Sequence, residues 1–261
     1  VNYDLGFATL TSSSSHLDVK SYQSSISTLP LPDPSLNFGL LLLGSVNQSK
    51  GFAQEVRLAS TDNGGALNWL VGAFYSDTEF FNARDDFGIF FNGASLNDFG
   101  PEQLFVTSKS TAIFANVGYD LSEQLTLTVG ARYFEDDQSL TYSSPSTDRD
   151  GSESFDQLSP KVSLSYALND DASIYASIAE GFRSGGFNFS RDETYDSETV
   201  RTYEVGAKAS LLNNRLSVAS ALFHSQYLDY QGTDIVDTAN GETAIINPGE
   251  VEMQGFEFST Q

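Results

Sequence analysis

The segment that decides the fold of this chain runs from Ala172 to Gln231. It reads ASIYASIAEGFRSGGFNFS at 172–190 and, after an acidic link, TVRTYEVGAKASLLNNRLSVASALFHSQYLDYQ at 199–231. One face of the stretch 199–211 holds Tyr203, Val205, Ala207, Ala209 and Leu211, and the other holds Thr202, Glu204, Gly206, Lys208 and Ser210. Because successive strand side chains point to opposite faces, this alternation predicts a strand with one apolar and one polar face.

A tight turn at 212–215 leads from this strand into a second one of similar length. Such a hairpin favours a sheet with lipid on one side and water on the other. In 172–183 and 216–228, however, both phases of the alternation contain apolar residues, so the pattern does not assign a lipid face and a lumen face to these two stretches.

Composition narrows the class of protein. The chain has 261 residues, of which 39% are hydrophobic and 13% aromatic, with 21 glycines and only 7 prolines, as expected of a sheet with many turns. The longest apolar run, at 40–43, is far shorter than the roughly 20 residues that a membrane helix needs. Membrane strands are only half apolar, so a membrane barrel remains compatible with this composition.

The net charge of −22 argues against a nucleic-acid partner, because neutralising phosphates requires a basic surface. Acidic residues gather in the expected links, where a solvated surface is favoured over the alternative of divalent-cation binding. Cysteine is absent, which excludes disulfides and thiolate metal sites. The sequence begins at Val1 and ends at Gln261 inside strand-like material, which predicts a fragment of a longer protein.

About ten strands are expected, and they alternate with two kinds of connection. Pro30, Pro32 and Pro34 predict a loop over 14–49, with at most a short strand near 18–25. The other expected strands lie at 3–13, 51–60, 67–80, 104–120, 125–141, 157–168, 172–183, 199–211, 216–228 and 243–261. Short turns near Gly64, Ser122, Asp170 and Asn213 alternate with long links near Asp86, Thr147, Asp192 and Thr238.

Short turns at one end and long loops at the other are typical of an outer-membrane barrel. Aromatic residues near strand ends, at Trp69, Tyr119, Tyr133 and Tyr166, suit the girdles at the two membrane interfaces. The expected fold is therefore all-β: an antiparallel up-and-down transmembrane β-barrel segment that occupies 1–261 and is incomplete or open. The alternative is a soluble β-sandwich whose apolar faces meet in a core.

Several phrases carry a family resemblance. FAQEVRLAS at 52–60 and LNWLVGAFY at 67–75 resemble barrel strands of TonB-dependent outer-membrane receptors. GFRSGGFN at 181–188, TYEVGAKASLLNNRL at 202–216 and ALFHSQYLDYQ at 221–231 are similar to later strands of that family, as are NPGE at 247–250 and GFEFS at 255–259. Each phrase alone is weakly specific, but together they cover nearly the whole chain in the family's order.

The resemblance implies uptake of a scarce, bulky nutrient across the outer membrane of a Gram-negative bacterium. Typical cargo in this family is a ferric siderophore, haem, cobalamin or an oligosaccharide. An inner-membrane TonB complex supplies energy by acting on an N-terminal plug domain inside a 22-stranded barrel. The chain lacks the plug, the TonB-contacting segment and the final strands, so the plug of the same full-length protein, the TonB complex, membrane lipid and a small-molecule or metal-chelate ligand are the expected partners.

Two groups of candidate site residues follow from the expected strands and links. The inward charges are Glu55, Arg57, Arg132, Glu204 and Lys208. They are expected to form a salt-bridge ladder between neighbouring strands, and the alternative is that they bind the plug or line the ligand path. The candidate ligand-side residues on the links are Arg183, Phe187, Phe189 and Tyr195.

No enzymatic, cofactor or metal site is expected. His16 and His224 lack ligand spacing, and His224 and Ser225, as neighbours on one strand, point to opposite faces and cannot pair as base and nucleophile. The acidic run 135–137 is expected at a solvated rim rather than as a catalytic carboxylate pair. Glycines 181, 185 and 186 are expected to mark a kink where the backbone approaches another element.

Two function classes stay open from the sequence. The first is a fragment of a nutrient-importing receptor barrel. The second is a β protein without transport, either a structural outer-membrane barrel or a secreted binding or adhesion sheet.

Overall fold

The computed structural model describes residues 1–29, 39–61, 64–91, 94–98, 100–188, 193–237 and 242–261. Every regular element in these residues is a β-strand, and twelve strands form one antiparallel sheet. Two further pairs of strands form small separate hairpins. No helix in the described part of the chain is long and apolar enough to cross a membrane.

Sixteen strands are described, and their bounds follow chain order. They are β1 (Asn2–Asp4), β2 (Ala8–Leu29), β3 (Gly39–Ser60), β4 (Leu67–Phe91), β5 (Ala94–Asp98), β6 (Glu102–Asp120), β7 (Leu125–Ser143), β8 (Asp148–Asn169), β9 (Ala172–Arg183), β10 (Gly186–Phe187), β11 (Thr194–Tyr195), β12 (Glu198–Leu211), β13 (Leu216–Leu228), β14 (Gly232–Asp237), β15 (Glu242–Ile246) and β16 (Val251–Thr260). Without the short β1 and β5, ten long strands of the described chain make up the sheet, as expected from the sequence.

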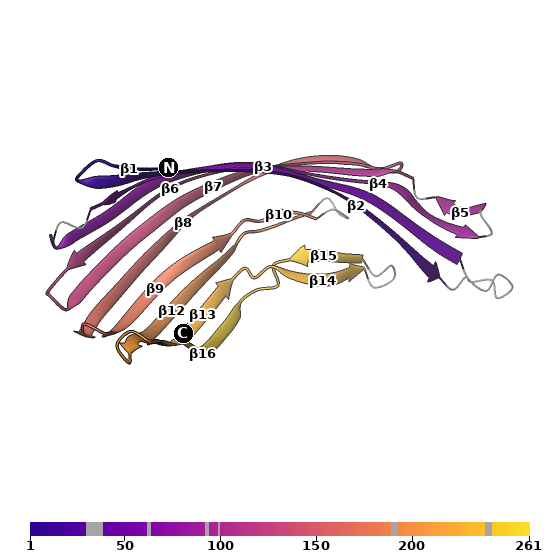
Figure 1. The fold of residues 1–261 in the computed structure, drawn as a ribbon. Helices are drawn as coiled ribbons and strands as arrows, with labels where there is room; N and C mark the ends of the chain where they lie inside the picture. Colours follow the sequence, from indigo (N-terminus) through magenta and orange to yellow (C-terminus); the bar gives the residue numbers. More distant parts are fainter. Residues whose placement is uncertain (30–38, 62–63, 92–93, 99, 189–192, 238–241) are drawn as a thin grey trace.

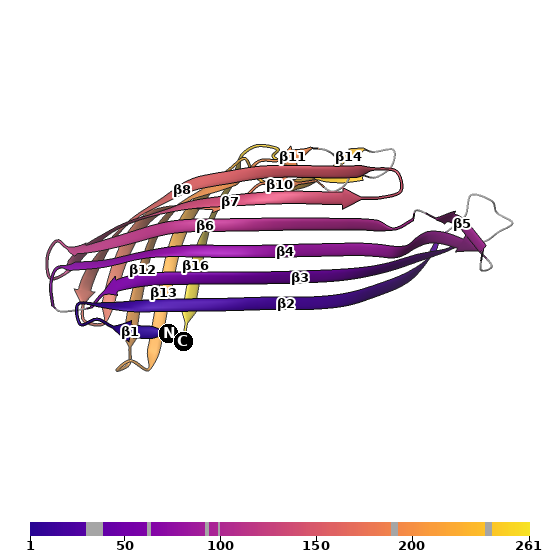
Figure 2. The same cartoon turned by 90° about the horizontal axis from the view of Figure 1, so that it is seen from above.

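The strands of the sheet follow chain order, β1-β2-β3-β4-β6-β7-β8-β9-β12-β13-β16, with β5 added beside β4. Short turns gather at one end of the sheet, and the hairpins β10–β11 and β14–β15 lie toward the other end (Figure 1). Seen from above, β12, β13 and β16 pass beneath the first half of the sheet (Figure 2). The chain therefore forms a curled, open, up-and-down sheet.

The strands extend well beyond the lengths expected from the sequence. The stretch 14–49, expected as a loop, lies mostly in β2 and β3, which pair in unbroken register from Ala8–Ser60 to Leu29–Gly39. The three prolines fall outside the described residues. The expected long link at 142–155 is also wrong, because only 144–147 separates β7 from β8. Apart from the apolar run at 40–43, these stretches are mainly polar, and they pair as strands without a regular alternation because they extend beyond the apolar band of the sheet.

The outer face of the sheet carries a continuous band of exposed apolar side chains. Opposed residues of neighbouring strands share a face, and Val162 of β8, Ile178 of β9 and Tyr203 of β12 lie in one such row. Ile113 and Leu222 on the same face are 66% and 63% exposed, whereas no large side chain in the described chain is fully buried. Soluble monomers rarely expose such a surface.

Aromatic residues lie at the two limits of this band. Tyr119 and Tyr166 lie near the short turns, whereas Tyr75 and Tyr133 each lie eight residues along the strand from the short-turn ends of β4 and β7. At usual strand rise and tilt, the apolar part of β12 spans about 20 Å, close to the height of roughly 25 Å found in membrane barrels. The soluble sandwich is wrong for the described residues, because no second large sheet covers the apolar face.

Register assigns the faces that alternation left open. On β9, Ile174 and Ile178 oppose outer-face residues of β12, and Tyr175 and Ser177 therefore lie on the inner face. On β13, Leu222 opposes Val205 and lies on the outer face. His224 shares that face and stacks on Tyr203, with 6.3 Å between ring centroids.

Aromatic rings cover glycines on the inner face, and this explains why the sequence pattern was mixed. Tyr175 lies directly opposite Gly206, and a Cβ added to Gly206 would lie 2.6 Å from atoms of the tyrosine ring. Phe223 covers Gly255 in the same way, with a distance of 2.8 Å. Each ring fills the space above a residue without a side chain, as in aromatic rescue of strand glycines.

Candidate functional site

Three of the predicted inward charges line one inner-face cavity. Glu55 and Arg57 lie two residues apart on β3, with 3.7 Å between Arg57 Nη1 and Glu55 Oε1. Arg132 on β7 lines the same cavity, and its guanidinium lies 5.4 Å from the ring centroid of Phe74 and 5.3 Å from that of Phe134. These charges therefore lie together on the inner wall.

The other two predicted inward charges lie on β12 and share one aromatic partner. The hydroxyl of Tyr175 donates a hydrogen bond to Glu204 Oε1 at 2.6 Å, and the ammonium group of Lys208 lies 5.4 Å from the Tyr175 ring centroid. These contacts with Glu204 and Lys208 also keep the Tyr175 ring over Gly206. The structure thus places the five inward charges in two separate clusters.

The expected salt-bridge ladder among these five residues is wrong. In the described part of the chain, Arg57 pairs along its own strand, and Arg132 and Lys208 contact aromatic rings instead of carboxylates. Cross-strand ion pairs do occur elsewhere, and they join Arg84 to Glu102, Arg183 to Glu198 and Arg201 to Glu180. Aromatic residues lie directly opposite three of the five charges: Phe74 opposite Glu55, Phe114 opposite Arg132 and Phe223 opposite Glu204.

The end of β9 and the segment after it fold over the inner face of β7 and β8. The rings of Phe182 and Phe134 lie 5.8 Å apart between centroids, and Gln138 donates a hydrogen bond from Nε2 to the carbonyl of Gly185 at 3.2 Å. A Cβ on Gly185 would meet the ring of Phe155. The predicted close approach of the glycine-rich segment is therefore confirmed.

Asp136 accepts a hydrogen bond from Gln138 and so orients the side chain that contacts Gly185. The prediction of a solvated rim for this residue is wrong, because Asp136 is only 4% exposed. Its carboxylate accepts hydrogen bonds from Ser108 Oγ at 2.6 Å, Ser110 Oγ at 3.0 Å and Gln138 Nε2 at 2.8 Å. Because β7 is longer than expected, Asp136 lies within the sheet, where three donors compensate for the lost hydration of its charge.

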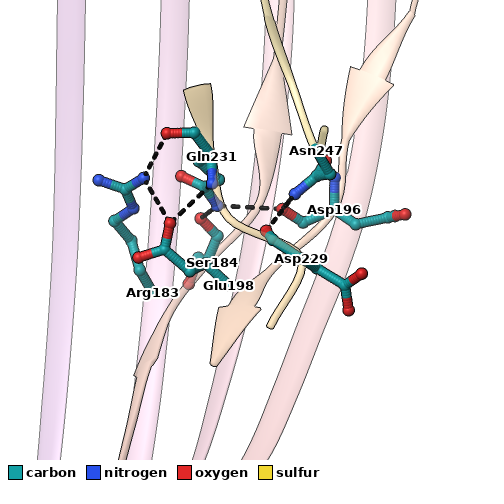
Figure 3. Close-up of polar contacts among 7 residues, drawn as sticks. All are labelled: Arg183, Ser184, Asp196, Glu198, Asp229, Gln231 and Asn247. Atoms are coloured by element: carbon teal, nitrogen blue, oxygen red, sulfur yellow. Dashed lines mark hydrogen bonds and ion pairs between the residues drawn. The ribbon is translucent and has the colours of Figure 1, made fainter. Parts of the chain in front are cut away.

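A polar network joins the ends of β9, β12 and β13 on the long-loop side (Figure 3). Buried Glu198 accepts hydrogen bonds on Oε2 from Arg183 Nη2 at 3.1 Å and from the backbone N–H of Gln231 at 2.7 Å. The Gln231 side chain then donates to the carbonyls of Ser184 and Asp196, at 2.9 and 3.0 Å. These contacts tie together three strand ends that are far apart in sequence.

Two asparagine amides connect the loop hairpins to this network. Asn247 accepts a hydrogen bond from the Asp196 N–H at 2.8 Å and donates to the carbonyls of Asp196 and Asp229, at 3.1 and 2.7 Å (Figure 3). Asn188 exchanges two hydrogen bonds with the backbone of Ile245, at 2.8 and 2.9 Å. Each side-chain amide thus pairs with a backbone N–H and C=O, as the backbone of a neighbouring strand would. Together the two amides join β10–β11 to β14–β15.

The predicted ligand-side residues lie in this region. Arg183 belongs to the network, while Phe187 and Tyr195 form part of the β10–β11 hairpin, with pairs Gly186–Tyr195 and Phe187–Thr194. Burial raises the pKa of the Tyr195 hydroxyl above its usual value, and nearby Arg183 opposes that rise. Phe189 lies outside the described residues.

Sequence reasoning missed Glu198, Gln231 and Asn247. Each makes its contacts with residues at least 15 positions away in the chain, and no periodic pattern marks such partners. The only local signal was composition, since amide and acidic residues follow the strand ends in 193–198 and 229–231.

Replacing Asn247 with alanine is expected to loosen the loop unit without unfolding the sheet. The variant loses three hydrogen bonds, each with a net value of about 0.5–1.5 kcal/mol. Hydrogen exchange should show faster exchange at the Asp196 amide, with unchanged protection in β12. A matched Asn169→Ala change, at a short turn, should leave Asp196 unaffected. Unchanged exchange at Asp196 in the Asn247 variant would contradict the assigned network.

His224 and Ser225 do not form a catalytic pair. Ser225 is buried on the inner face, where its hydroxyl lies 2.8 Å from that of Thr202, whereas His224 stacks on Tyr203 on the outer face. The predicted separation of the two side chains is confirmed. Among the described residues, no three histidine or carboxylate side chains gather in a metal-binding arrangement.

Comparison with known proteins agrees with this architecture. The family model described as TonB dependent receptor-like, beta-barrel matches residues 1–261. The pesticin receptor of Yersinia enterocolitica is 20% identical over 233 residues, covering 85% of this chain and 33% of that protein. The probable TonB-dependent siderophore receptor PiuA of Acinetobacter baumannii is 24% identical over 165 residues, covering 58% of this chain and 21% of that protein.

Solved structures show the same fold. The ferric yersiniabactin uptake receptor FyuA from Yersinia pestis superposes with a TM-score of 0.75 at 17% identity, covering 99% of this chain and 38% of the other. The siderophore receptor PiuA from Acinetobacter baumannii gives a TM-score of 0.74 at 19% identity, covering 99% and 42%. The chain spans about a third of the curated pesticin receptor.

The family and its named relatives are receptors, and this agrees with the expectation that the chain is not an enzyme. Related proteins of this class include a ferripyoverdine receptor of the outer membrane of Pseudomonas aeruginosa. The family model covers the whole sequence, and the described strands follow the expected up-and-down order. This chain belongs to the TonB-dependent receptor-like β-barrel family.

Proposed function

We propose that this chain forms part of the barrel wall of an outer-membrane receptor that imports a scarce, bulky nutrient in a Gram-negative bacterium. The observation that carries the proposal is the two-sidedness of the sheet. Its outer face presents an exposed apolar band, and its inner face carries charged and aromatic side chains beneath a linked pair of loop hairpins. A wall between lipid and a polar passage requires this arrangement.

The proposed ligand is a ferric siderophore or a similar metal chelate. The names of several relatives support this class, since they include a siderophore receptor and a ferric yersiniabactin uptake receptor. The ligand would enter on the side of β10–β11 and β14–β15, where Arg183, Phe187 and Tyr195 lie. Phe189, outside the described residues, belongs to the same proposed ligand side.

The proposed energy source is an inner-membrane TonB complex acting on a plug domain of the same full-length protein. In that arrangement, the inner-face charges Glu55, Arg57, Arg132, Glu204 and Lys208 face the plug and the ligand path. The rest of the barrel would pair with the edges at β2 and β16. Beyond its short pairing with β1, β2 has a free edge in the described sheet, and β16 has a free edge on the side away from β13.

The test is iron-limited growth of a strain that makes no siderophore and lacks its own receptors. Expression of the full-length receptor that carries this chain should permit growth on at least one ferric siderophore from a chemically varied panel. Growth should disappear when TonB is deleted. A receptor that is folded in the outer membrane but supports neither growth nor radioactive iron uptake with any member of the panel would contradict the proposal.

A further inference from the structure

The inner-face cavity beside Arg132 has an unusual charge for this chain. Its volume is about 380 Å³, and its lining includes Arg57, Arg132 and Lys161 together with the carboxylates of Glu55 and Glu180. The whole protein has 13 basic and 35 acidic residues. Three cations around one cavity are therefore a local reversal of the overall acidic character.

Both carboxylates of the cavity already have a cationic partner. Glu55 pairs with Arg57, and Glu180 accepts a hydrogen bond from Arg201 Nε at 2.8 Å. Arg132 and Lys161, by contrast, have no carboxylate partner among the described residues. Within the described sheet, the charges of Arg132 and Lys161 are therefore not neutralised by a carboxylate.

Arg132 is held in place by its ring contacts. Its guanidinium lies over the rings of Phe74 and Phe134, which stabilise the cation through the negative faces of their π-systems. These contacts do not use the N–H donors of the guanidinium, and no described protein group accepts a hydrogen bond from them. A guanidinium fixed in this way presents a planar set of donors that matches a carboxylate.

We propose that this cavity binds a planar anionic group, of which an aryl carboxylate is the simplest example. Arg132 would hold the carboxylate through its N–H donors, and Lys161 would add a second positive charge. The ring of Phe114, which lines the cavity, would contact the aryl plane. The inference rests on the proposed receptor function, because it places a binding station on the inner wall below the loops.

The cavity volume limits what this station holds. Ligand pockets that enclose a drug-sized molecule measure about 300–1,000 Å³, so this cavity lies near the lower limit. It accommodates one anionic arm of a larger ligand rather than the whole of it. Arg183, Phe187 and Tyr195 do not line this cavity, so this station differs from the ligand-side residues proposed above.

The experiment uses the full-length receptor in detergent micelles, with para-fluorobenzoate as the probe and fluorine NMR as the readout. The neutral para-fluorobenzamide has the same shape and serves as the control ligand. Saturable binding of the benzoate is expected, with a Kd on the order of 1 mM for so small a ligand. The benzamide should bind at least about tenfold more weakly, because a charge-assisted hydrogen bond is lost.

Three variants locate the binding. Arg132→Gln and Lys161→Gln should each weaken benzoate binding, by about tenfold for Arg132, which donates the charge-assisted hydrogen bonds. Lys109→Gln changes an exposed lysine on the outer face and should have no effect. Lys161 is itself exposed, so its variant decides the question if Arg132→Gln lowers the yield of folded receptor.

The results separate this inference from the proposed function. Benzoate binding that is absent, that equals benzamide binding, or that persists in both the Arg132 and Lys161 variants would overturn the anion site. TonB-dependent growth on a siderophore would still support the receptor function in each of these cases. Failure of growth on every siderophore, with benzoate binding intact and sensitive to Arg132, would instead overturn the proposed function and leave the anion site standing.

Discussion

Replacing Gly206 of β12 with valine is expected to destabilise the folded sheet by about 1–3 kcal/mol, the usual cost of overpacking. The ring of Tyr175 lies over Gly206, and a Cβ there would approach ring atoms to 2.6 Å. The ring cannot rotate away at no cost, because its hydroxyl donates to Glu204 and Lys208 lies against its face. The measurement is the free energy of unfolding of the full-length receptor in lipid vesicles, from a urea titration.

Two matched variants test whether the tyrosine ring is the cause. Gly118→Val places the same side chain on an inner-face strand glycine whose Cβ would meet its nearest neighbour at 3.6 Å, an ordinary contact distance. This control should cost much less than Gly206→Val. Adding Tyr175→Ala should recover part of the loss caused by Gly206→Val, which a double-mutant cycle measures as a coupling energy. Equal effects at both glycines, or zero coupling, would contradict the assigned ring packing.

Replacing Val205 with arginine is expected to cost about 1–4 kcal/mol, because a cation on the lipid face of a barrel costs most at the midplane and less toward the interfaces. Val205 is 60% exposed, so in a water-soluble sheet the same substitution would be almost neutral. The measurement is again the unfolding free energy in lipid vesicles. The large expected effect at such an exposed position arises only when lipid surrounds the outer face.

Ser177→Arg is the matched control for the lipid-facing position. Ser177 lies on the inner face of the neighbouring strand, directly opposite Glu204, so an arginine there has water and a carboxylate within reach. Its expected cost is below about 1 kcal/mol, in the range of a cross-strand pair. If both arginines had the same effect, the assignment of an outer lipid face and an inner aqueous face would be wrong.

The two faces of β12 could be predicted from the sequence because alternation there is not interrupted between Tyr203 and Leu211. The same method failed on β9 and β13 for a physical reason. Tyr175 and Phe223 are aromatic residues on the inner face, where they cover Gly206 and Gly255, and His224 is a polar residue on the outer face. Only the register of neighbouring strands separates these roles.

Strand length was underestimated where no apolar band constrains the sequence. The serine-rich stretch of β2 beyond residue 14 is mainly polar, and its few apolar residues are divided between the two faces, with Leu17 and Val19 on one and Tyr22 and Ile26 on the other. This composition resembles that of a loop. Its backbone nevertheless pairs with β3 over the full length of the strand. Outside the apolar band neither face has to be apolar, so hydrogen bonding between the strands maintains the pairing and leaves no alternating pattern in the sequence.

The candidate site was only partly accessible from the sequence. Inward charges such as Arg132 were predicted because their strands alternate, but their partners were not, since these are rings on neighbouring strands. The network around Glu198 and Asn247 depends on loop conformations that bring distant segments together. Such contacts cannot be predicted from residue type and spacing.

The central claim is that the outer face of this sheet lies in lipid and its inner face in water. The chain contains no cysteine, so single cysteines can be introduced at Ser163, Leu164, Ala176 and Ser177 and labelled with a bimane fluorophore. Register places Leu164 and Ala176 on the outer face and Ser163 and Ser177 on the inner face. In vesicles containing the full-length receptor and nitroxide-labelled lipid, strong quenching at Leu164 and Ala176 with weak quenching at Ser163 and Ser177 is predicted. Equal quenching at all four positions, or none at any, would contradict the claim.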